Sequence, residues 1–181
     1  MTLAGQLSLG PSHRWDDLRA PATAIPLQGQ SGDPDADTDG TLLFDDSTAE
    51  QVSIIWQMPH AWIHGSGVRL HVHWAKSTDA AGDVEWEMRY RTVANGAVAS
   101  AWSEWAAADA RSHTLASDQA VVIDAWSEIA MTGLIGSCML GVQIRRNPAA
   151  TDDTYAADAR LWEADIHYMV GNLGSEEEYP T

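Results

Sequence analysis

The chain has 181 residues, of which 45% are hydrophobic and 20% are charged, so it is long enough for one domain with a core and wholesale disorder is excluded. Its 26 acidic and 10 basic residues give a formal net charge of −16, which disfavours nucleic acid and anionic membrane surfaces as partners. No apolar stretch is long enough for a membrane-spanning helix, and the N-terminal segment lacks the basic start of a secretory signal, so we expect neither.

Residues 1–50 differ in composition from the rest of the chain. Four prolines interrupt them, namely Pro11, Pro21, Pro26 and Pro34. Residues 28–40 are polar, acidic and rich in turn-forming residues, so we predict an extended arm and acidic loop over residues 1–50. Scattered apolar residues such as Trp15 and Leu18 indicate that this arm docks, either on a neighbouring subunit or on its own domain.

The acidic part of this region has the spacing of a calcium-binding loop. Asp35, Asp37 and Asp39 occupy its first, third and fifth positions, Gly40 its sixth and Asp46 its twelfth. Carboxylates at these positions with glycine at the sixth are what such a loop requires. An apolar ninth residue and the lack of flanking helices favour a solvated acidic loop instead. We keep both interpretations, with calcium as the only cofactor considered for this loop.

From residue 51 to 175 the hydrophobicity alternates with a period of two, which is typical of strands with one buried face. The clearest runs cover residues 68–75, 84–92 and 161–170, and weaker ones cover 52–58, 97–105, 119–125 and 134–145. About seven or eight strands of this kind predict an all-β fold, an antiparallel β-sandwich or jelly roll, followed by an acidic tail over residues 176–181.

The run at 161–170 assigns side chains to two faces of its strand. Trp162, Ala164 and Ile166 fall on one face, and Asp165 and His167 fall on the other. The alternation thus groups Trp162 with its two apolar neighbours on one face of the predicted strand.

Two histidines are candidates for a metal site. His71 and His73 lie two apart in a predicted strand, so both project from its polar face, where neutral imidazoles can bind a transition metal. Residues 65–73 match the Gly-x5-His-x-His opening of the cupin metal motif, but Ser77 and Thr78 stand where its glutamate belongs. Histidines at a surface or interface are the first interpretation, and a cupin-like metalloprotein is our third functional hypothesis.

A pair of tryptophans forms a further candidate site. Trp102-Ser103-Glu104-Trp105 resembles the Trp-Ser-x-Trp element of receptor modules built on fibronectin-like sandwiches, in which arginines stack on the indole rings. Exposed tryptophans also serve as platforms for sugars. We therefore predict that Trp102 and Trp105 contact a glycan or a subunit interface, with ordinary packing as the alternative.

Catalytic machinery is missing from the sequence. There is no Gly-x-Ser-x-Gly nucleophile elbow, no phosphate loop and no dinucleotide fingerprint. The single cysteine, Cys138, lies in an apolar run and is predicted to be a small buried residue; alone, it excludes an intramolecular disulfide. We expect no enzymatic activity and name no catalytic residue.

Several short motifs follow one another in a fixed order over residues 13–175. They are Trp15-Asp16-Asp17-Leu18-Arg19, Met58-Pro59-His60-Ala61-Trp62 with Gly65, His71-Val72-His73-Trp74, residues 81–84 leading to Trp86 and Tyr90, and residues 156–168 followed by Gly171 and Gly174-Ser175. Together they resemble the small all-β structural proteins of tailed bacteriophages and phage-like particles, of the decoration, spike or fibre type.

This resemblance implies a non-enzymatic virion component displayed on the head or tail surface. Such a protein contacts other virion proteins and is expected to be a homo-oligomer, without catalytic residues. The alternative function is a carbohydrate-binding module that recognises a host surface glycan. A glycan module needs aromatic side chains exposed in a groove, whereas a decoration protein needs them buried at subunit contacts.

Overall fold

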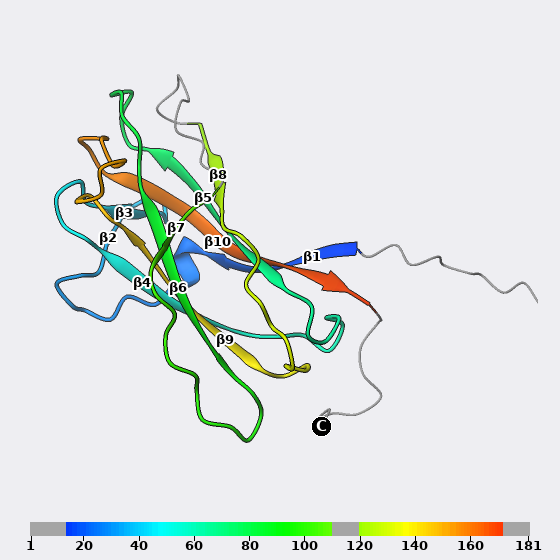
Figure 1. The fold of residues 1–181 in the computed structure, drawn as a ribbon. Helices are drawn as coiled ribbons and strands as arrows, with labels where there is room; N and C mark the ends of the chain where they lie inside the picture. Colours follow the sequence, from blue (N-terminus) through cyan, green and yellow to red (C-terminus); the bar gives the residue numbers. More distant parts are fainter. Residues whose placement is uncertain (1–13, 110–119, 172–181) are drawn as a thin grey trace, which may run out of the picture.

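The computed structural model describes residues 14–109 and 120–171, which form an almost entirely β structure (Figure 1). Within these ranges ten strands make two antiparallel sheets, so the predicted all-β sandwich is confirmed. The strand number exceeds the prediction because two of the strands have only two residues each. The arm residues 1–13 and the acidic tail 176–181 lie outside the described residues.

Sheet A has the strand order β2-β3-β10-β5-β8, with β1 also paired to β10. Its strands are β1 (Arg14–Pro21), β2 (Asp35–Ala36), β3 (Leu42–Phe44), β5 (Val68–Lys76), β8 (Val122–Ala125) and β10 (Ala159–Val170). Sheet B has the order β4-β9-β6-β7. Its strands are β4 (Gln51–Gln57), β6 (Trp86–Val93), β7 (Ala106–Ala107) and β9 (Met139–Arg146).

The helical content of the described residues is one 3-10 turn, η1 (Ala22–Ala24). No helix among the described residues has the length and apolar character needed to span a membrane.

The part of the predicted arm that the structure describes belongs to the sandwich. β1 runs antiparallel beside β10 over its whole length, from Arg14 opposite Val170 to Pro21 opposite Glu163 (Figure 1). Ile25, just beyond η1, is buried in the core. The sandwich therefore begins well before the predicted boundary at residue 51. Of the two docking alternatives, residues 14–50 take the second and pack on their own domain.

The hydrophobic core lies between the two sheets and is joined by aromatic rings. Trp86 of β6 packs edge-on against Phe44 of β3 at 4.9 Å between ring centroids, and against Trp74 of β5 at 6.0 Å. All three rings are buried. Edge-to-face packing is a favoured geometry for aromatic pairs, so these rings hold sheet B against sheet A.

β10 contains a β-bulge at Trp162. Leu161 and Glu163 lie opposite consecutive residues of β5, so Trp162 is an extra residue in the strand. The side chain of Trp162 is 41% exposed, whereas Ala164 and Ile166 are buried. The prediction that these three residues share one face is wrong, because the bulge shifts the alternation by one residue.

Candidate functional site

Polar side chains gather on the outer face of sheet A, which points away from sheet B. Three neighbouring strands supply them in register: Asp17 of β1 lies opposite His167 of β10, and Asp165 of β10 lies opposite His71 of β5. Side chains of directly opposed residues on one face of a sheet are in contact range. Strand pairing therefore assembles the cluster from three segments that are far apart in the sequence.

The carboxylate of Asp165 is the centre of this cluster and its side chain is only 2% exposed. His73 Nε2 lies 3.1 Å from its Oδ1, and His167 Nε2 lies 2.8 Å from its Oδ2. His71 Nδ1 lies 3.9 Å from the same Oδ2. One buried carboxylate thus faces three imidazole rings.

The pKa values of the two histidines of the His-x-His motif shift in opposite directions. The hydrogen bond to Asp165 raises the pKa of His73, and the negative charge of that carboxylate acts in the same direction. Burial lowers the pKa of His71, and the neighbouring His167 lowers it further. The environment of His73 thus favours the protonated ring, and that of His71 favours the neutral imidazole, the form that binds metals.

The sequence placed His71 and His73 on one outward face of a strand, and the structure places them there. The sequence did not predict the remaining members of the cluster, because the carboxylate that the cupin motif places after His73 comes from β10 instead. The one signal in the sequence for these missing members was the alternation in residues 161–170, which places Asp165 and His167 on the same face of their strand. The pairing of β10 with β5 and β1 was not readable from the sequence.

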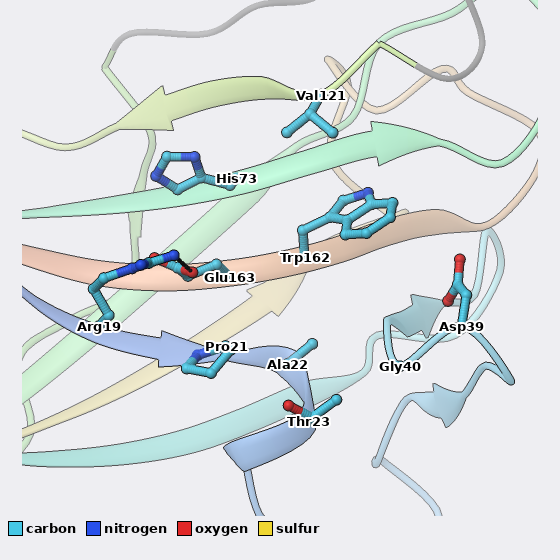
Figure 2. Close-up of a pocket in the computed structure, with 10 residues that line it drawn as sticks. All are labelled: Arg19, Pro21, Ala22, Thr23, Asp39, Gly40, His73, Val121, Trp162 and Glu163. Carbon is cyan, nitrogen blue, oxygen red and sulfur yellow. Dashed lines mark hydrogen bonds and ion pairs between the residues drawn. The ribbon is translucent and has the colours of Figure 1, made fainter.

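A hollow of about 390 Å³ adjoins this cluster at the bulge in β10. Figure 2 shows Trp162 in it, between the Arg19–Glu163 pair and Asp39. Arg19 donates two hydrogen bonds to the Glu163 carboxylate, at 2.6 and 2.5 Å. The hollow is further lined by Thr23 and by small apolar residues. It combines one exposed aromatic ring with charged and hydroxyl groups, and sequence analysis missed it because it missed the bulge.

The four carboxylates predicted to bind calcium do not converge. Asp37 and Asp39 instead face Arg160, at 3.3 and 3.5 Å. Asp39 also accepts hydrogen bonds from the hydroxyl and backbone N–H of Thr41, and these lower its pKa. Among residues 14–109 and 120–171, no cluster of three metal-ligating groups includes any of the four, which are Asp35, Asp37, Asp39 and Asp46. The structure favours the other interpretation, an acidic loop held by its own hydrogen bonds and by one arginine.

The two predicted aromatic site residues form a cation–π ladder on the outer face of sheet B. Arg91 and Arg89 lie over Trp102, at 4.6 and 5.3 Å from the ring centroid. Arg89 and Arg145 lie over Trp105, at 4.6 and 4.1 Å. The arginines therefore compete with any sugar for these rings, and the ladder stabilises the sheet surface.

Cys138 is buried, in agreement with its place in an apolar run. Burial raises the pKa of its thiol to about 11. Both its burial and this raised pKa disfavour the thiolate, in keeping with a packing role.

No protein-family model matches the chain, and no curated protein matches it. Solved structures with some likeness include dimeric latent PorU from Porphyromonas gingivalis (TM-score 0.41, 10% identity, covering 87% of this chain and 13% of that one). A second is the structure of infectious bursal disease virus Gx strain (TM-score 0.42, 8% identity, covering 92% of this chain and 35% of that one). A third is the CBM22-1 xylan-binding domain from Paenibacillus barcinonensis Xyn10C (TM-score 0.33, 12% identity, covering 86% of this chain and 94% of that one). The chain thus spans a small part of the first two, and likeness at this level carries no inference about its function.

Proposed function

We propose that the protein is a non-enzymatic structural component of a phage or phage-like virion, displayed on the head or tail surface as a homo-oligomer. The position of the family-like motifs in the fold carries this proposal. Trp62 and Trp74, which end two of these motifs, are both buried in the core. The motif that begins at Trp15 forms most of β1, which completes sheet A. Because the motifs that carry the resemblance lie in the core and in a paired strand, the resemblance extends over the whole fold and not over one surface patch.

The charge of the chain suits display in many copies. A net charge of −16 keeps closely spaced copies soluble, while oligomer contacts must offset the repulsion. Among the exposed apolar side chains on the described surface, Ile55 and Val98 lie on separate elements, whereas Val121 and Trp162 line one hollow. We propose other virion proteins as its partners, and we expect neither nucleic-acid binding nor membrane insertion.

The test is immunogold electron microscopy of intact particles from the source organism with antibody against this protein. We expect label at regular positions on the shell or tail. An antibody against the major shell protein of the same particles is the positive control. Particles that carry the control label but none for this protein would contradict the proposal.

A second function, recognition of a host surface glycan, is favoured by the hollow at Trp162. Sugars stack on exposed indole rings and hydrogen-bond to charged and hydroxyl groups beside them. Trp162 presents such a ring next to Arg19, Glu163 and Asp39 (Figure 2). We therefore propose this hollow, and not the arginine-stacked Trp102 and Trp105, as the glycan contact.

Replacing Trp162 by alanine is expected to weaken glycan binding at least about thirtyfold, the effect of losing about 2 kcal/mol from a central aromatic contact. Titration calorimetry with host surface polysaccharide measures it. Trp102→Ala is the matched control, since it removes a tryptophan from the opposite sheet and is expected to keep the wild-type affinity. Loss of binding in the control alone would move the site to the ladder, and a wild type that binds no host polysaccharide would remove the glycan function.

A further inference from the structure

We propose that His71, Asp165 and His167 form a binding site for one divalent transition-metal ion on the outer face of sheet A. The site differs from the predicted His71–His73 pair, because His73 is not one of its ligands. It is independent of the virion and glycan proposals and stands on the geometry of its own three side chains.

The three candidate ligand atoms lie close enough together to share one ion. His167 Nε2 lies 3.1 Å from His71 Nδ1 and 2.8 Å from Asp165 Oδ2. His71 Nδ1 lies 3.9 Å from Asp165 Oδ2. Ligands about 2.0–2.1 Å from a tetrahedral zinc ion lie about 3.3 Å from one another, within the range of these three distances.

His167 Nε2 has several close polar neighbours. A neutral imidazole carries one N–H in all, so His167 Nε2 has at most one proton to donate. Two carboxylate oxygens and one imidazole nitrogen lie within 3.1 Å of it. One N–H can be shared between two acceptors, so these contacts are compatible both with hydrogen bonding and with metal binding. A cation among His71, Asp165 and His167 uses the same three ligand atoms.

Burial and charge suit a bound ion. Asp165 closes the site on its inner side, whereas Asp17 is 46% exposed at its outer side and leaves a path for an ion to enter. The carboxylate of Asp165 brings one negative charge to the ion, and that of Asp17 lies beside His167. His73 bonds Oδ1 of Asp165 and so directs Oδ2 toward His71 and His167. His73 is therefore a positioning residue, in the role that hydrogen-bond partners of metal ligands commonly have.

The ligand types select the class of metal. Imidazole nitrogen binds zinc, copper, iron and nickel in preference to calcium and magnesium, which take oxygen ligands only. Two imidazoles and one carboxylate, with a fourth position for water, are a ligand set that zinc takes in proteins. We therefore choose Zn²⁺ as the probe and Ca²⁺ as the ion expected not to compete.

The experiment is calorimetric titration of Zn²⁺ into the full chain, purified without a histidine tag and freed of metal with a chelator. We expect one equivalent to bind and excess Ca²⁺ to leave the titration unchanged. His71→Gln and His167→Gln each remove a direct ligand and are expected to weaken binding by more than the 10–100-fold typical of outer-shell changes, that is, at least about a hundredfold. His64→Gln, which removes an exposed histidine elsewhere, is the matched control and is expected to bind as the wild type does.

Two further measurements keep the result decisive. Circular dichroism of the metal-free variants tests that they fold, and Zn²⁺ is expected to raise the Tm of the wild type but not of His167→Gln, since a ligand stabilises only the state that binds it. Co²⁺ bound to the wild type is expected to show the intense visible bands of tetrahedral coordination, a test that needs no variant. Less than half an equivalent of bound Zn²⁺, or wild-type affinity in His167→Gln, would overturn the proposal.

Discussion

Replacing Arg146 by methionine is expected to lower the free energy of unfolding by about 3–5 kcal/mol, because it leaves a buried carboxylate without its counter-charge. Arg146 of β9 is fully buried, and so is its partner Asp153. Nε and Nη2 of Arg146 donate to the two carboxylate oxygens of Asp153, at 2.9 and 2.8 Å. Its remaining donors bond the backbone carbonyls of Phe44, Tyr155 and Ala157.

This arginine stabilises the junction of three chain segments. It lies in sheet B, while Phe44 belongs to β3 of sheet A and Tyr155 and Ala157 belong to the loop that leads into β10. A planar guanidinium with five N–H donors satisfies this arrangement, and no apolar side chain does. The free energy lost therefore includes the unpaired carbonyls as well as the unpaired Asp153.

Urea unfolding followed by tryptophan fluorescence measures the effect. The matched control is Arg145→Met, on the adjacent residue of the same strand, where the arginine is partly exposed, pairs with Glu87 and lies over Trp105. We expect the control to cost about 1–2 kcal/mol, from one surface ion pair and one cation–π contact. Equal unfolding midpoints for the two variants would show that the buried network contributes no more than the exposed one.

The fold was predictable where a strand has one buried and one solvated face. The alternating run in residues 84–92 covers β6 except for its last residue, Val93, and that in 68–75 nearly coincides with β5. β1 was not predictable as part of the sheet, because its sequence carries little apolar alternation and its partner β10 lies about 150 residues away. Its place depends on backbone hydrogen bonds, which leave no mark on the side-chain pattern.

Only part of each candidate site could be predicted from the sequence. His71 and His73 were identified as neighbours on one face because two-residue spacing fixes their relation within one strand. Asp165 and His167 join them only through strand pairing, which single-sequence patterns do not specify. The hollow depends on a bulge that exposes Trp162, and one extra residue in a strand reverses the faces assigned on one side of it.

Replacing Trp86 by alanine is expected to cost about 3–5 kcal/mol, the effect of removing a large aromatic side chain from a packed core. Trp86 has no exposed surface and lies edge-on between Phe44 and Trp74 of the facing sheet. Its indole N–H has no hydrogen-bond partner among the described residues, so the loss is one of packing and not of a hydrogen bond. For a domain whose net stability is about 5–15 kcal/mol, this is a fifth or more of the total.

The nine tryptophans of the chain make a comparison within one protein informative. Trp102 is of the same residue type but lies half-buried over Arg89 and Arg91, outside the core. Its replacement by alanine removes about 1 kcal/mol of exposed cation–π contact and leaves no internal cavity. Urea unfolding monitored by near-ultraviolet circular dichroism is therefore expected to give a much lower midpoint for Trp86→Ala than for Trp102→Ala. Similar midpoints would mean that the ladder, and not the aromatic contact between the sheets, is the main tryptophan contribution to stability.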